Sequence, residues 1–338
     1  MLLRSFSLAV LLLAGAPALA ADTPAADPCS TQRLLSRGGS FATASDGVRI
    51  WYKLAGREGA PVIAYLHGGP GYNAYAFEES AGRLLEETFR VLYLDQRGCG
   101  RSTFDGPIER YGMQQTIDDL EHLRTLIGAE RLILTGHSFG GAVAAAYTAR
   151  YPTRVAAVVM IDTTHDMGRA LQYQVEHIDS IADTAFADKA QQIRAIARSS
   201  DSAMERLGKL YGAIGRLPLQ RKLHYADPAN QESMETLDRE SGFLNCTSGN
   251  VVEAFSAEGY LSKALPDVAR PLGVPALLIA GRDSHVIGAE NVRSAAQAWN
   301  AEVEWLDAGH FVYFERPREF AQAIERFVEK ISFRSDAR

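Results

Sequence analysis

The feature that most constrains this 338-residue chain is a series of short apolar runs that alternate with helical patterns. The apolar runs read PVIAYL, FRVLYL, RLILT, RVAAVVMI, VPALLI and AEVEWL, and such runs are typical of strands buried on both faces of a parallel sheet. A hairpin with its turn at Asp46-Gly47 precedes them. This pattern predicts an α/β fold: a mostly parallel eight-stranded sheet flanked by helices, with its polar functional groups at the carboxyl ends of the strands.

Helical periodicity fills the intervals between these runs. The expected helices cover residues 76–87, 113–127, 139–151, 287–299 and 317–331.

The organisation along the chain follows from where this alternation holds. Residues 39–163 and 263–333 carry it, and we expect them to form the two parts of one core. Residues 164–262 contain no clear buried strand and read as amphipathic helices, which predicts a helical cap over the strand ends. Residues 21–38 are expected to be a loose N-terminal arm.

Residues 1–20 have the three-part order of a secretory signal peptide. Arg4 precedes an apolar run, and Ala18-Leu19-Ala20 supplies the small residues of a cleavage site. We therefore expect cleavage near Ala20 and a periplasmic or secreted protein. No later stretch has about 18 uninterrupted apolar residues, so we expect no membrane span once the signal is removed.

The net charge and the cysteines indicate which partners and which disulfides to expect. The net charge is −6 and no basic run or stripe occurs, so nucleic acid is not expected as a partner. Export permits disulfides, and we expect Cys29 in the arm to pair with Cys246, leaving Cys99 as the odd thiol. Spacing alone also allows three free thiols, and the sequence does not define an oligomeric state.

Gly136-His137-Ser138-Phe139-Gly140 matches the G-x-S-x-G nucleophile elbow. In this motif the serine sits on a strained turn between a strand and a helix, so the residues two away must be small. Ser138 follows the apolar run RLILT and precedes a helical pattern, which is the context that the motif requires. Ser138 is therefore the predicted nucleophile.

A serine nucleophile needs a base and an acid that orients it. His310 follows a strand near the C-terminus, in the order Ser, acid, His, and is the predicted base. We favour Asp283, at the end of VPALLIAGRD, as the acid; the commoner spacing in such folds would place it at residue 284, which is Ser284. Asp162, which ends the neighbouring run, stays open as the alternative.

The oxyanion of an acyl transfer needs two backbone donors. The loop HGGPG at residues 67–71 follows the third strand, and we expect the amides of Gly69 and Phe139 to form the donor pair. His67 and His137 are interpreted as structural. No metal or nucleotide motif is present, so no cofactor or metal is expected.

With these motifs in place, the sequence resembles the α/β-hydrolases and, within them, the proline iminopeptidase group of serine aminopeptidases. The resemblance rests on HGGPG at 67–71, DQRGCGRS at 95–102, the elbow and DAGH at 307–310. It implies Ser138 as nucleophile, His310 as base, an acid at Asp283, and removal of N-terminal residues, often proline, from peptides or amides. In DQRGCGRS we expect Arg97 to form a charged fork with a carboxylate below the site, as structural support.

Two departures from that family keep a second function open. The elbow has His137 and Phe139 where the family has glycine and tryptophan, and the three tryptophans, Trp51, Trp299 and Trp305, all lie outside the cap. Cap acids (Glu176, Glu232, Glu235, Glu240 and Glu258) are the candidates for binding a substrate amine. The expected substrate is a small peptide, amide or ester; the alternative function is a carboxylesterase or lactonase. A catalytically silent binding protein would require a broken triad, and an epoxide hydrolase or dehalogenase would have aspartate in place of Ser138.

Overall fold

A computed structural model describes residue 29 and residues 38–102, 106–243, 246–262, 268 and 270–336. The predicted signal peptide and nearly all of the predicted N-terminal arm lie outside these residues. None of the helices in this part of the chain is long and apolar enough to cross a bilayer.

Within the described residues, one sheet of eight strands carries the fold, in the order β1-β2-β4-β3-β5-β6-β7-β8. The strands are β1 (Ser40–Thr43), β2 (Arg49–Gly56), β3 (Val62–Leu66), β4 (Arg90–Leu94), β5 (Leu132–His137), β6 (Val155–Ile161), β7 (Ala276–Gly281) and β8 (Glu302–Leu306). The predicted hairpin is present, because β1 pairs antiparallel with β2 and β2 pairs antiparallel with β4. All later pairs are parallel, which confirms the predicted α/β fold.

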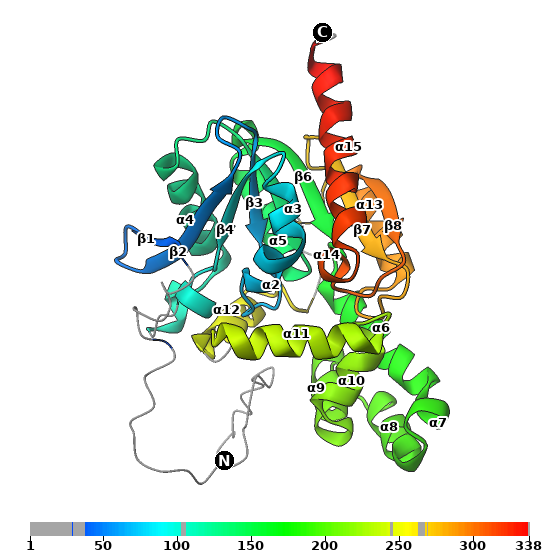
Figure 1. The fold of residues 1–338 in the computed structure, drawn as a ribbon. Coiled ribbons are helices and arrows are strands. Elements are labelled where there is room, and N and C mark those ends of the chain that lie inside the picture. Colours follow the sequence, from blue (N-terminus) through cyan, green and yellow to red (C-terminus); the bar gives the residue numbers. More distant parts are fainter. Residues whose placement is uncertain are drawn as a thin grey trace.

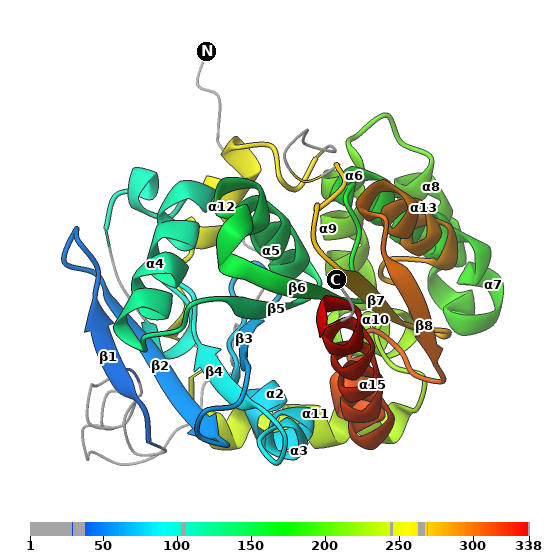
Figure 2. The same cartoon turned by 90° about the horizontal axis from the view of Figure 1, so that it is seen from above.

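Helices cover both faces of this sheet (Figure 2). On one face lie α4 (Met113–Leu126), α5 (Phe139–Arg150) and α13 (Ala289–Trp299), and on the other lie α2 (Tyr75–Phe77), α3 (Arg83–Leu85) and α15 (Pro317–Asp336). Each face has its own apolar core. Strands β5 and β7 are buried along their whole length, and this two-sided burial is what their uninterrupted apolar sequences predict.

One predicted helix differs from the structure. Residues 76–87 were expected to form a continuous helix, but α2 and α3 are separated by a wider turn at Glu78–Gly82. Ser80 leaves the helical conformation, with φ −122° and ψ −109°. Its hydroxyl donates to the carbonyl of Ala76 at 2.6 Å, which is the local side-chain competition by which serine disrupts helices.

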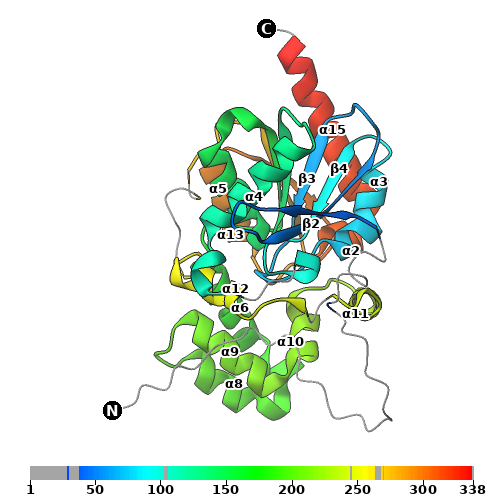
Figure 3. The same cartoon turned by 90° about the vertical axis from the view of Figure 1, so that its left-hand side faces the viewer.

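Seven α-helices lie between β6 and β7 in the described residues: α6 (Met167–Ser180), α7 (Ala182–Ala185), α8 (Ala190–Ala197), α9 (Ala203–Ile214), α10 (Arg216–Leu223), α11 (Pro228–Ser241) and α12 (Asn250–Ala257). Their starts are encoded locally: Ser202 and Glu205 form a capping box at α9, and Asp227 caps α11. Figures 1 and 3 show α6 and α8–α11 stacked beyond one end of the sheet. We call these helices the cap.

Candidate active site

Ser138 occupies the turn between β5 and α5 with φ 52° and ψ −122°, a conformation that residues with side chains rarely adopt. The flanking glycines are required by contact. A Cβ on Gly136 would collide with the carbonyl of Gly140, and a Cβ on Gly140 would collide with the carbonyl of Leu66. The structure therefore has the strained strand-to-helix geometry that the sequence motif predicts.

His310 lies in the loop between β8 and α14 (Val312–Glu315), beside the elbow. Its backbone carbonyl is 3.0 Å from Nε2 of His137, and the two imidazole rings have their centroids 4.6 Å apart. Nδ1 of His310 is 2.6 Å from Oδ2 of Asp162, which leaves Nε2 as the nitrogen available to a substrate-side partner. Burial lowers the pKa of His310, so the imidazole is neutral near neutral pH.

Asp162 is the carboxylate that orients this imidazole. It directly follows β6, the parallel neighbour of β5, and the Ser138 amide donates to the carbonyl of Ile161 at 2.9 Å. Asp162 is completely buried, whereas Ser138 and His310 are 7% and 4% exposed. Burial raises the pKa of the Asp162 carboxyl, and hydrogen bonds from Ser284 and the Gly281 amide oppose that rise.

The expectation that Asp283 holds the imidazole is wrong for this structure. Asp283 is exposed, and its carboxylate has no hydrogen bond or ion pair with any described residue. After Gly281 the chain turns outward at Arg282 and Asp283 and returns inward at Ser284, which is buried. The inward-facing residue of this turn is Ser284, which has no carboxylate. The carboxylate beside His310 is instead that of Asp162 at the end of β6, the alternative acid of the sequence analysis.

The loop HGGPG lies against the elbow. An ideal Cβ on Gly68 would be 2.9 Å from Cβ of Ser138 and 2.9 Å from the carbonyl oxygen of His137. Gly69 has φ +116° and is exposed, and its amide donates to no backbone carbonyl of the described residues. Phe139 is the first residue of α5, where amides lack acceptors within the helix. Gly69 and Phe139 therefore remain the predicted oxyanion donors.

Two histidines near the elbow hold the surrounding loops in place. Nε2 of His67 accepts from the amide of Gln96 at 2.9 Å, and the side-chain amide of Gln96 donates to the carbonyl of His67 at 2.7 Å. His137 binds the His310 backbone, as described above. These bonds fix the HGGPG loop and the His310 loop relative to the sheet.

Two of the buried ion pairs made by the segment DQRGCGRS support the site from below. Arg97 forms the predicted fork, with Nε and Nη2 donating to the Asp119 carboxylate at 2.7 and 2.6 Å. Arg101 makes the second, with Nε 2.7 Å from Oδ2 of Asp95. Planar guanidinium groups suit such bidentate contacts, and both pairs brace the loop rather than face the nucleophile.

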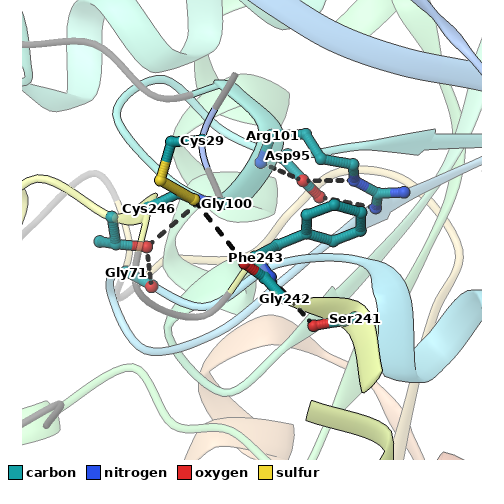
Figure 4. The surroundings of a disulfide bond; sticks show 10 residues. Cys29, Gly71, Asp95, Gly100, Arg101, Ser241, Gly242, Phe243 and Cys246 are labelled. Carbon is teal, nitrogen blue, oxygen red and sulfur yellow. Dashed lines mark hydrogen bonds and ion pairs between the residues drawn. A yellow bond between two sulfur atoms is a disulfide. The ribbon is translucent and has the colours of Figure 1, made fainter. Parts of the chain in front are cut away.

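The predicted disulfide between Cys29 and Cys246 is present, and it lies beside the HGGPG loop (Figure 4). The residue after Cys246 is Thr247, whose hydroxyl donates to the carbonyl of Gly71 at 2.8 Å and accepts from the amide of Gly100 at 3.2 Å. The disulfide thus anchors a segment that holds the last residue of the HGGPG loop.

The cap meets the core at the link between α10 and α11. The His224 carbonyl in this link accepts from the His310 amide at 2.7 Å, and the two imidazole centroids are 5.5 Å apart. Burial lowers the pKa of His224 to about 3. Nδ1 of His224 is buried without a hydrogen-bond partner among the residues described. A neutral imidazole of the cap therefore faces the catalytic histidine candidate.

Asp238 on α11 is a cap carboxylate that the sequence analysis missed. Its Oδ1 accepts from the hydroxyl of Tyr72 at 2.6 Å, and Tyr72 directly follows the HGGPG loop. The Tyr72 ring lies 6.5 Å from that of Phe311, the neighbour of His310. Burial raises the pKa of Asp238 to about 6. Helical spacing was the available signal, because Asp238 lies four and seven residues after the buried Met234 and Gln231.

Among the described residues, no group of three or more histidine, cysteine or acidic side chains is placed to hold a metal ion.

Comparison with known proteins agrees with this geometry. Residues 61–317 match the alpha/beta hydrolase fold family. The chain is 30% identical to a proline iminopeptidase from Pestalotiopsis fici over 152 residues, 43% of this chain and 53% of that protein. It is 39% identical to a bifunctional esterase/perhydrolase from Acinetobacter calcoaceticus over 124 residues, 36% of this chain and 43% of that protein. The chain thus spans about half the length of these relatives, or less.

A solved structure shows the same fold over most of the chain. The proline iminopeptidase-related protein from Thermus thermophilus superposes with a TM-score of 0.71 at 22% identity, covering 86% of this chain and 96% of that one. The nucleophile elbow, the sheet order and the family match over residues 61–317 agree with one another. The chain belongs to the α/β-hydrolase family, and its relatives include proline iminopeptidases.

Proposed function

We propose that the protein is a serine hydrolase with Ser138, His310 and Asp162 as its catalytic triad. Nε2 of His310 accepts the hydroxyl proton as Oγ of Ser138 attacks the substrate carbonyl, and Asp162 stabilises the imidazolium through Nδ1. The Gly69 and Phe139 amides donate to the oxyanion. The imidazolium then protonates the leaving amine or alcohol. Water, deprotonated by His310, releases the acyl group and restores the Ser138 hydroxyl.

The preferred substrate in this proposal is a peptide or amide with a free N-terminus, as for a proline iminopeptidase-like aminopeptidase. The observation that carries it is Asp238: a half-buried cap carboxylate next to the HGGPG loop, with no cationic partner within salt-bridge distance among the described residues. A carboxylate with a pKa of about 6 is mostly ionised at neutral pH and attracts a substrate ammonium group. An ester substrate has no need of such a charge.

Export is part of the same proposal. The disulfide between Cys29 and Cys246 supports it, because disulfides persist in oxidising compartments. Cleavage near Ala20 leaves Cys29 in the mature chain and available for this bond. Intact-mass measurement of the protein recovered from the periplasm or medium tests the prediction, and a chain that retains residues 1–20 would contradict it.

The test of activity compares the wild-type protein with Ser138→Ala on three substrates: an alanyl or prolyl arylamide with a free amine, its N-acylated form, and a short-chain aryl ester. The proposal predicts hydrolysis of the free-amine arylamide that is lost on acylation and in Ser138→Ala. Ester hydrolysis alone, still dependent on Ser138, would replace the aminopeptidase with the carboxylesterase or lactonase. If Ser138→Ala hydrolyses all three substrates as fast as the wild-type protein, the serine hydrolase mechanism is rejected.

A second variant tests the amine-binding role. Asp238→Asn is expected to raise KM for the free-amine arylamide about tenfold or more, the value of one charge-assisted contact, while leaving ester hydrolysis within about twofold. Glu232→Gln is the matched control, because the Glu232 side chain on the same helix is 78% exposed. Equal KM values for Asp238→Asn and Glu232→Gln would remove Asp238 from the site.

A further inference from the structure

The Asp162 carboxylate accepts hydrogen bonds from the last residue of β7 and from the turn that follows it. Oδ2 of Asp162 accepts from the Ser284 hydroxyl at 2.5 Å, and Oδ1 accepts from the Gly281 amide at 3.2 Å. Oδ2 is also the atom that lies 2.6 Å from Nδ1 of His310. One carboxylate oxygen is therefore shared by the imidazole and by a serine hydroxyl, and all three side chains are buried.

The backbone gives the carboxylate little freedom. Asp162 has φ 37°, a left-handed conformation outside the ordinary range of side-chain-bearing residues. Its amide donates to the carbonyl of Ile279 at 2.8 Å, so the residue is fixed against β7 as well as by its own strand. The carboxylate group itself contacts the Gly281 amide, Nδ1 of His310 and the Ser284 hydroxyl among the described residues.

We propose that Ser284 is a positioning residue for the acid of the triad. The inference rests on the proposed serine hydrolase function. It follows from the shared oxygen: Oγ of Ser284 and Nδ1 of His310 contact the same atom from two sides. In this proposal the Ser284 hydroxyl orients the Asp162 carboxylate, and that carboxylate orients the His310 imidazole.

The experiment measures the positioning role with Ser284→Ala, Ser284→Thr and the exposed control Ser233→Ala. Ser284→Ala is expected to lower kcat about 10- to 100-fold, the value of a hydrogen bond to a charged group, with KM within about threefold. The acid limb of the pH profile of kcat moves to higher pH, because loss of the donor raises the pKa of the Asp162 carboxyl. Ser284→Thr keeps the hydroxyl and restores the acid limb.

An unchanged kcat and acid limb in Ser284→Ala would overturn the positioning role. Failure of the proposed function is separate, because Ser138→Ala would then retain wild-type activity.

Discussion

Replacing Glu315 by glutamine is expected to loosen the junction between the cap and the His310 loop. Glu315 ends α14 and is 6% exposed. Its Oε1 accepts from the Gly309 amide at 2.9 Å, directly before His310. Its Oε2 accepts from the Ala226 amide and the Asn230 side chain of the cap, each at 3.1 Å. One carboxylate therefore serves donors of both parts of the protein.

The expected magnitude follows from these donors. An amide has one oxygen, so either the Gly309 amide or the cap donors would face an NH₂ group. An unsatisfied buried donor, such as the Gly309 amide, costs about 1–3 kcal/mol. The donors between α10 and α11 can bind water instead, so their loss adds only about 1 kcal/mol or less. We therefore predict that Glu315→Gln lowers the free energy of unfolding by about 2–3 kcal/mol, and that kcat falls roughly tenfold because the His310 loop is displaced.

Urea unfolding and kcat, measured on the same preparations, check both numbers. Glu319→Gln is the control, since it makes the same charge change at an exposed residue of α15. If Glu315→Gln and Glu319→Gln have the same unfolding free energy and the same kcat, the carboxylate does not join the cap to the His310 loop.

Three further predictions concern the HGGPG loop, the disulfide and the cap. Gly68→Ala should abolish activity, because its Cβ would contact the elbow at 2.9 Å, whereas Gly212→Ala, with open space around it, should be neutral; comparable kcat values would contradict this. Serine at both residues of the Cys29–Cys246 disulfide should lower the unfolding free energy by about 2–4 kcal/mol, and an unchanged urea midpoint would refute it. Burial lowers the pKa of His177 from 6.5 to about 4, so the unfolded chain binds more protons in that window and stability falls as pH drops through it; a His177→Gln variant with the same pH dependence of unfolding would count against this.

The fold was predictable because its signals are local. Uninterrupted apolar runs such as LILTGH occupy fully buried strands, and the alternation of strands with helices fixes the parallel topology. The prediction of one continuous helix over residues 76–87 was wrong because the backbone at Ser80 leaves the helical conformation. The hydrogen bond from the Ser80 hydroxyl to the Ala76 carbonyl leaves no sign in the apolar periodicity of the sequence.

The nucleophile was predictable because steric contacts fix the residue types around it. The acid was not predictable because it depends on which residue of a turn faces the site. A side chain on Gly136 is excluded by the carbonyl of Gly140 within the same five-residue motif, and one on Gly140 by the carbonyl of Leu66 at the end of β3. The choice between Asp162 and Asp283 depends on which residue of the turn after β7 points inward, a property of three adjacent strands that spacing does not contain. Asp238 was missed because its significance comes from Tyr72, 166 residues away in sequence.

The measurement that tests the central claim most directly compares Asp162→Asn with Asp283→Asn, using kcat on the arylamide or ester that the wild-type protein hydrolyses. The two substitutions are chemically identical, and asparagine is tolerated in the left-handed backbone of residue 162. The structure predicts a loss of about 10³- to 10⁴-fold for Asp162→Asn and a change within about twofold for Asp283→Asn. A large loss for Asp283→Asn with a nearly unaffected Asp162→Asn would contradict the triad of Ser138, His310 and Asp162.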